Sequence, residues 1–130
     1  MIEINRRTFA AAAAVVAALP TEALGVTGAG MHGLIGRMRA APGQRDALIA
    51  ILLEGTGAMP GCLSYVVAKD PADADAIWIT EVWDSKASHR ASLRLPAVRA
   101  AIARARPLIA GFDSGTETEP VGGVGLPRRA

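Results

Sequence analysis

The segment that most constrains the fold is Ile77–Trp83 (IWITEVW), which consists of β-branched and aromatic residues around a single charge. This composition predicts a β-strand. Cys62–Ala68 (CLSYVVA) is also rich in strand-forming residues, and the cluster Asp70-Pro71-Ala72-Asp73 between the two segments is typical of a turn. The two segments therefore predict an antiparallel hairpin.

Further elements are predicted on both sides of this hairpin. Leu48, Ile51 and Leu52 lie at i, i+3 and i+4, the spacing of one helical face, and Pro96 is suited to the first turn of a helix. We expect a strand over Met31–Arg39, a helix over Asp46–Glu54, a helix from Ser85 to Leu95, a second helical piece from Pro96 that ends at Gly111, and a weaker strand over Phe112–Thr118.

The order strand, helix, strand, strand, helix, strand is that of a ferredoxin-like α+β fold. In this fold a four-stranded antiparallel sheet carries its helices on one face. The other face is uncovered, and an apolar uncovered face is commonly buried against a second copy. The order of elements therefore predicts a homodimer.

The first thirty residues differ in composition from the rest of the chain. Asn5-Arg6-Arg7-Thr8-Phe9 precedes an uncharged apolar run, Ala10–Leu19, which Pro20 ends. A charged start followed by a short apolar run is typical of an export signal, and the paired arginines resemble a twin-arginine signal. The run is shorter than the roughly 20 residues that span a bilayer. We therefore expect export, with periplasmic localisation and no stable membrane insertion.

Two alternatives for this segment stay open: an alanine-rich leader on a cytoplasmic protein, or a true start at Met31. We divide the chain into a leader and linker over residues 1–30, one domain over residues 31–119, and a Gly-rich tail over residues 120–130.

The charge and cysteine content exclude several classes of protein. Fourteen basic and twelve acidic residues give a net charge of +2, and no basic run exceeds a pair, which argues against a nucleic-acid partner. Cys62 is the single cysteine, so the chain holds neither an internal disulfide nor a multi-cysteine zinc site. We expect Cys62 to be a small buried strand residue.

Several segments together resemble the antibiotic biosynthesis monooxygenase (ABM) family, in its quinol monooxygenase branch. They include the sequence IWITEVWDSKASH, followed by Ala91-Ser92-Leu93 and by Arg106-Pro107-Leu108-Ile109-Ala110-Gly111-Phe112. Pro60-Gly61-Cys62-Leu63-Ser64-Tyr65 also fits. The resemblance covers residues 31–123, and its most specific part runs from Glu81 to Leu93.

The resemblance implies a dimeric α+β barrel. It also implies a monooxygenase that oxidises a quinol or phenolic aromatic with O₂ and needs no cofactor or metal. The protein then has to hold an electron-rich ring, accept a proton from its hydroxyl group and exclude water. His89 and Glu81 are the candidate catalytic residues. The candidate substrate-binding residues are Trp83, Tyr65, Ser92 and Trp78.

The spacing of these residues supports a site but leaves other roles open. Ser92 follows His89 by three residues on one helical face, and Glu81 and Trp83 share one face of a strand. Trp78 lies on the opposite face of that strand, so at least one tryptophan belongs to the core or to an interface. Glu81 can instead pair with an arginine, and Tyr65 can pack at an interface.

His32, at the start of the domain, is expected to be structural or solvated. Some members of the family carry a histidine where this chain has Ser92, one turn after His89. Haem-degrading relatives use an asparagine of the first strand, and this chain has no asparagine after Asn5, which disfavours haem degradation. Two further alternatives remain: a non-catalytic periplasmic module that binds a flat apolar ligand, and an isomerase-like member of the same barrel superfamily.

Overall fold

The computed structural model describes residues 30–127, so the predicted leader and its export signal lie outside the described residues. The elements follow the order β1 (His32–Ala40), α2 (Arg45–Gly55), β2 (Cys62–Lys69), β3 (Ala76–Trp83), α3 (Lys86–Ser92), α4 (Pro96–Ala105), the 3₁₀ turn η3 (Arg106–Leu108) and β4 (Ile109–Thr118). Residues 119–127 form neither helix nor strand. Among residues 30–127, no helix combines the length and apolar character needed to cross a membrane.

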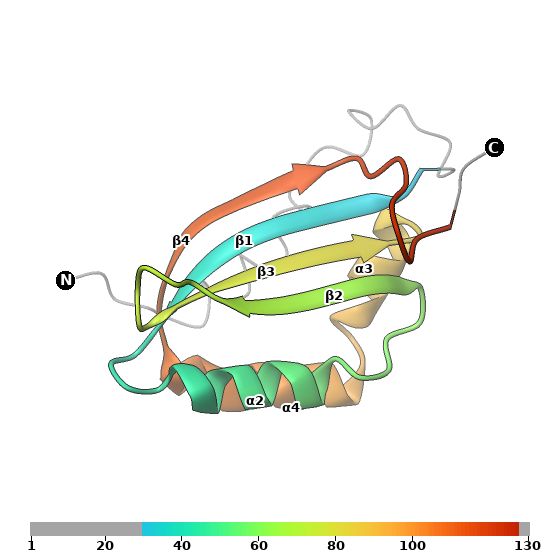
Figure 1. The fold of residues 1–130 in the computed structure, drawn as a ribbon. Coiled ribbons are helices and arrows are strands. Elements are labelled where there is room, and N and C mark those ends of the chain that lie inside the picture. The colour runs from blue at the N-terminus through green and yellow to red at the C-terminus, as the bar shows by residue number, and fades with distance from the viewer. Residues whose placement is uncertain (1–29, 128–130) are drawn as a thin grey trace.

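The four strands form one open antiparallel sheet in the order β2-β3-β1-β4. The helices α2 and α4 lie against one face of this sheet, and α3 packs at its end (Figure 1). Within residues 30–127, the other face carries no helix. The predicted ferredoxin-like α+β fold with helices on one face is therefore confirmed.

The sheet register decides which side chains face the helices. On β1, His32 pairs with Trp83 and Leu34 with Glu81, and on β4 Glu117 pairs with Leu34. Because side chains alternate along a strand and paired residues point the same way, all five of these side chains share the helix-covered face.

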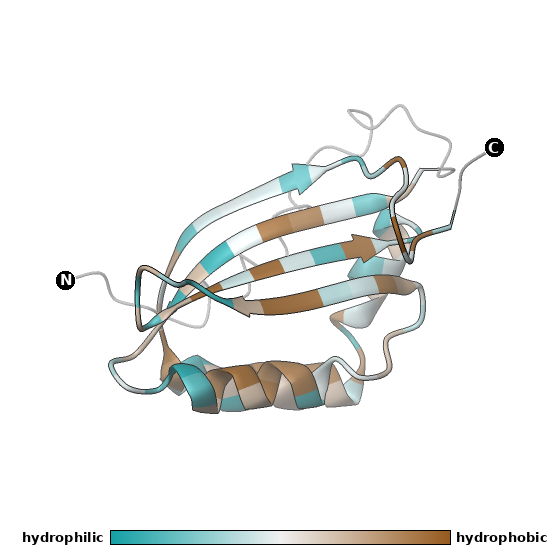
Figure 2. Cartoon of the chain, viewed as in Figure 1, coloured by the Kyte–Doolittle hydropathy of each residue, from teal (hydrophilic) through white to brown (hydrophobic). Residues whose placement is uncertain are grey.

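The core lies between this face and the helices. Leu48 and Leu52 of α2 pack against Ile77 and Ile79 of β3, as their spacing predicted, and Figure 2 shows the apolar residues that run along α2. A second cluster near α3 contains Trp83 together with Met59 and Val98. Other apolar members of the two clusters, such as Tyr65 and Ile102, contact both. One continuous core therefore runs from α2 to the residues around Trp83.

The end of the last helix differs from the prediction. The sequence suggested a helix up to Gly111, but α4 ends at Ala105 and β4 already begins at Ile109. Pro107 explains the difference, because proline lacks a backbone N–H and its ring clashes with the preceding turn of a helix. The buried Ile109 therefore belongs to the sheet, where it pairs with Ala40.

Candidate functional site

Glu81 and Trp83 lie next to each other on the helix-covered face of β3, as their spacing predicted. The indole Nε1–H of Trp83 donates a hydrogen bond to Oε1 of Glu81 across 3.0 Å. Trp83 is 1% exposed and packs in the core. The alternation of the strand thus brings a large aromatic ring and a carboxyl group to the same place.

Glu81 has no cationic partner among residues 30–127. The alternative that it pairs with an arginine is therefore not realised in the described part of the chain. Burial raises the pKa of Glu81 to about 7, and the hydrogen bond from Trp83 opposes this rise only in part. A carboxyl group with such a pKa exchanges its proton near neutral pH, which suits a general acid or base.

Tyr65 lies directly opposite Glu81 on the neighbouring strand β2. Burial raises the pKa of its phenol, and the nearby Glu81 and Cys62 act in the same direction. Tyr65 therefore stays protonated and flanks the carboxyl group as a neutral aromatic. Cys62 is half-buried, and burial raises the pKa of its thiol as well, so it is no thiolate at neutral pH.

His89 reaches this group of residues from the short helix α3. Ser85 caps the helix by accepting a hydrogen bond from the backbone N–H of Ser88. The capped helix places the His89 ring edge-on against Trp83, with 5.4 Å between ring centroids. His89 is 3% exposed. Burial, with smaller contributions from His32 and the neighbouring cations Arg90 and Lys86, lowers the pKa of His89 to about 4. The imidazole is therefore neutral at neutral pH.

Ser92 lies beside His89 on the same buried helical face, as predicted. Its hydroxyl group donates a hydrogen bond to the backbone oxygen of His89 across 2.6 Å. The hydroxyl proton of Ser92 is therefore used within α3, and a ligand can only donate to its oxygen.

His32 was expected to be structural or solvated, and the second of these descriptions is wrong. Its side chain is 6% exposed, and its ring lies 5.8 Å from that of His89. Nδ1 of His32 is 3.3 Å from Oε1 of Glu117 on β4. Burial lowers the pKa of His32, whereas Glu117 raises it. The antiparallel register explains the position, because it places the start of β1 beside the end of β3.

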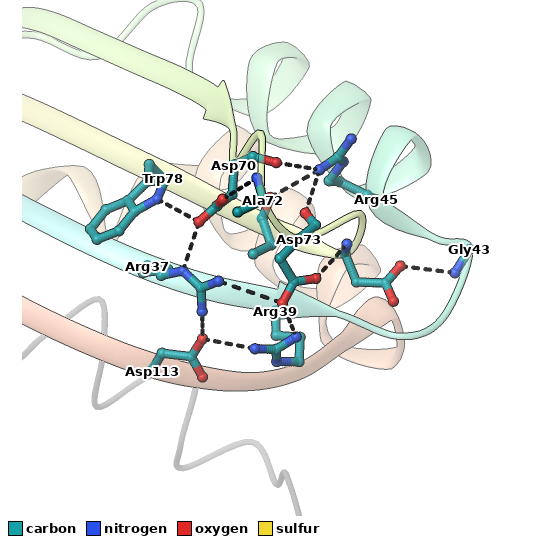
Figure 3. Close-up of polar contacts among 11 residues, drawn as sticks. Arg37, Arg39, Gly43, Arg45, Asp70, Ala72, Asp73, Trp78 and Asp113 are labelled. Carbon is teal, nitrogen blue, oxygen red and sulfur yellow. Dashed lines mark hydrogen bonds and ion pairs between the residues drawn. The ribbon is translucent and has the colours of Figure 1, made fainter.

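Trp78 does not join this group of residues. It lies on the uncovered face of β3, where it is 37% exposed and donates a hydrogen bond to Asp70. Figure 3 shows it at the edge of a charged network that includes Arg37, Arg39 and Asp113. Trp78 therefore lies on the opposite face of the sheet from Trp83, because an odd spacing along a strand reverses the face.

Two charged residues near His32 were not identified from the sequence. Lys86 precedes His89 by one helical turn, so the i, i+3 spacing could have revealed it. Glu117 carries no local signal, because only the pairing of β4 with β1 brings it close. In the part of the chain that the structure describes, no three His, Cys, Asp or Glu side chains are arranged to hold a metal ion.

The fold and the site define a ferredoxin-like α+β domain with a half-buried carboxyl group and two buried imidazoles between sheet and helices. The sequence matches the antibiotic biosynthesis monooxygenase family over residues 31–104. The chain belongs to this family, as its motifs suggested.

Solved structures agree with this assignment. A protein from Chloroflexus aurantiacus J-10-fl, which carries the same family name, is 73% identical, with a TM-score of 0.71 over 72% of this chain and 95% of that one. A protein from Caulobacter crescentus CB15 is 17% identical, with a TM-score of 0.63 over 76% of this chain and 95% of that one. The protein PA3566 from Pseudomonas aeruginosa is 21% identical, with a TM-score of 0.63 over 72% of this chain and 96% of that one. The last two share the fold. Among curated proteins, none matches this chain significantly.

Proposed function

We propose that this protein is a cofactor-independent monooxygenase that oxidises a quinol or phenolic aromatic with O₂. The observation that carries the proposal is the half-buried carboxyl group of Glu81, which has a pKa of about 7 and accepts a hydrogen bond from the indole of Trp83. Membership of the family supports a monooxygenase, and the buried aromatic surroundings of Glu81 suit a flat aromatic substrate.

In the proposed reaction, the ionised carboxylate of Glu81 accepts the proton of a substrate hydroxyl group. The resulting phenolate is a stronger reductant than the phenol, so it can pass electrons directly to O₂. One oxygen atom enters the ring and the other leaves as water. A hydroquinone thus becomes a hydroxyquinone, and the substrate supplies all the electrons that O₂ receives.

The two candidate catalytic residues receive different roles in this proposal. His89 has a pKa of about 4, so it accepts protons poorly at neutral pH, whereas Glu81 titrates near neutrality. We therefore assign proton acceptance to Glu81. His89, whose Nδ1 atom is buried without a hydrogen-bond partner among residues 30–127, is assigned to hold a substrate oxygen.

The same carboxyl group also suits an isomerase-like reaction, because a proton that Glu81 accepts can be returned at another position of the substrate. This second candidate needs no O₂. A binding module without turnover is the third candidate. It would require the same aromatic surroundings but no titration of Glu81.

Oxygen uptake with menadiol as substrate distinguishes the three candidates, with the autoxidation of menadiol alone as the blank. A monooxygenase consumes O₂ above the blank and incorporates one ¹⁸O atom from labelled O₂ into the product. Conversion of an aromatic substrate under argon would support the isomerase instead. Thermal stabilisation by menadione without any turnover would support the binding module.

We also propose that the protein works as a homodimer and is exported. The uncovered face of the sheet exposes Ile35, Val66 and Trp78, which suits contact with a second copy. The support for export is the sequence of residues 5–19, with its paired arginines and apolar run.

A further inference from the structure

His89 also belongs to a second group of polar side chains, which does not include Glu81. Lys86, His89 and Arg90 follow one another at i, i+3 and i+4 on α3, so they share one helical face. This face meets His32 at the start of β1, and Glu117 of β4 lies beside His32 and Lys86. We call these five residues the α3 cluster.

The α3 cluster contains four buried nitrogen atoms with no hydrogen-bond partner among residues 30–127. They are Nζ of Lys86, Nε of Arg90, Nδ1 of His89 and Nε2 of His32. The side chain of Lys86 is only 11% exposed, and its nearest carboxylate oxygen, on Glu117, is 3.9 Å away, which is beyond hydrogen-bonding distance. Buried polar groups are almost always hydrogen-bonded, so this concentration of free nitrogens points to a ligand.

The charges of the α3 cluster indicate the sign of that ligand. Lys86 and Arg90 are both cationic, and Glu117 is the one carboxylate that acts on either imidazole. Both imidazole pKa values are lowered, so the rings are neutral at neutral pH and the cluster has an excess of one positive charge. An anionic group would balance this excess and would accept hydrogen bonds from the ammonium and guanidinium groups.

We infer that the α3 cluster binds the carboxylate of an aromatic acid. A carboxylate offers two oxygens with about four lone-pair positions, which suits the ammonium group of Lys86 and the guanidinium group of Arg90 on α3. The aromatic body is indicated by Trp83, whose ring lies edge-on against that of His89 and whose backbone pairs with His32. The inference has one consequence that rests on the proposed function. If Glu81 accepts the proton of a substrate hydroxyl group, the substrate is a hydroxyaryl carboxylic acid, with its hydroxyl group at Glu81 and its carboxylate at Lys86.

The sheet geometry fits a ligand that reaches both ends of the site. Glu81 and Glu117 both pair with Leu34, one from each neighbouring strand. Two strand spacings separate them, so their backbones lie roughly 10 Å apart. A fused aromatic ring with substituents at opposite ends matches this arrangement better than a single small group does.

Calorimetric titration with two probes of the same shape tests the inference. The probes are 2-naphthoate, which is anionic, and 2-naphthalenemethanol, which is neutral. The wild-type protein is expected to bind 2-naphthoate about tenfold more tightly, the contribution of one hydrogen bond to a charged group. Equal affinity for the two probes would overturn the inference, as would the absence of binding by both.

Three variants test whether the α3 cluster causes the preference for 2-naphthoate over 2-naphthalenemethanol. Lys86→Met and Arg90→Gln are each expected to weaken binding of 2-naphthoate and to leave that of 2-naphthalenemethanol unchanged. Glu117→Gln removes the one opposing charge and is expected to strengthen binding of 2-naphthoate, which a loss of folding cannot imitate. Lys69→Met is the control, because Lys69 is exposed and pairs with the exposed Asp46.

A preference for 2-naphthoate that has the wild-type size in all three variants would place the anion elsewhere and overturn the inference. The titration involves no O₂. A failure of the proposed monooxygenase activity therefore leaves its outcome unaffected, and the two proposals can fail separately.

Discussion

Trp83 donates its indole N–H to the carboxyl group of Glu81, two residues earlier on β3, across 3.0 Å. It is the one hydrogen bond that this carboxyl group accepts from residues 30–127. The bond lowers the pKa of Glu81 less than burial raises it. The balance of the two effects leaves an acid that titrates near neutral pH in an aromatic environment.

Replacement of Glu81 by Gln should abolish proton acceptance while the shape of the side chain is kept. For a monooxygenase that uses Glu81 as base, we expect wild-type oxygen uptake to rise with pH through about 7, the pKa of Glu81. Glu81→Gln should lower the rate by at least about a hundredfold. Glu54→Gln, which changes an exposed carboxylate on α2, is the matched control. An unchanged rate and pH profile in Glu81→Gln would exclude Glu81 as the base.

Replacement of Trp83 by Phe keeps an aromatic ring but removes the hydrogen-bond donor to Glu81. Because that bond lowers the pKa of Glu81, its loss should raise this pKa and shift the midpoint of the pH–rate profile upward. Trp78→Phe removes the same group on the opposite face of the strand and should leave the midpoint unchanged. A midpoint that shifts equally in both variants would contradict the assignment.

The pH dependence of stability should reveal Glu81 and His89 as opposing contributions. Glu81 has its pKa raised from 4.5 to about 7, so the folded state holds the extra proton and stability falls as the pH rises through this range. His89 has its pKa lowered from 6.5 to about 4, so the unfolded state holds the extra proton and stability rises with pH from about 4 to 6.5. Each shift corresponds to about 3 kcal/mol.

Single variants separate the two contributions. Relative to wild type, the unfolding free energy of Glu81→Gln should increase with pH between 4 and 7, because the contribution of His89 is no longer opposed. In His89→Asn the unfolding free energy relative to wild type should decrease with pH between about 4 and 6.5, because the rise that His89 contributes is lost. Urea denaturation at several pH values measures both. Parallel curves for the two variants would contradict these pKa assignments.

Gly61 and Gly43 offer a matched test of the packing beside α3. Both have positive φ angles, 84° and 76°, so an alanine is strained at either position. A Cβ at Gly61 would collide with the side chain of Ser88, whereas a Cβ at Gly43 meets nothing within 4 Å. Gly61→Ala should therefore destabilise the protein by about 1–3 kcal/mol more than Gly43→Ala. Chemical denaturation gives the difference, and equal losses would show that the contact is unimportant.

The proposed dimer can be tested on the uncovered face of the sheet. Val66→Asp places a charge among the exposed apolar residues of this face and should convert a dimer to a monomer in light-scattering chromatography. Leu53→Asp changes an equally exposed apolar residue on α2, in the helical layer, and should leave the mass unchanged. A wild-type monomer, or a dimer that Leu53→Asp alone disrupts, would refute this interface.

Local sequence patterns predicted the elements and part of the site. The period of two placed Glu81 and Trp83 on one face of β3, and the helical period placed His89 beside Ser92. Each pattern links residues only a few positions apart, where strand or helix geometry alone determines direction. The end of α4 was misjudged because the apolar stripe continues through Ile109, although Pro107 had already ended the helix.

The sequence by itself therefore determined the fold class, the family and the pair Glu81 and Trp83. Only the tertiary structure decided that His32 and Glu117 lie beside His89, because β1 and β4 approach α3 through a sheet register that no local pattern encodes. It also decided the pKa values of Glu81 and His89, since both depend on burial by packed elements that are distant in sequence.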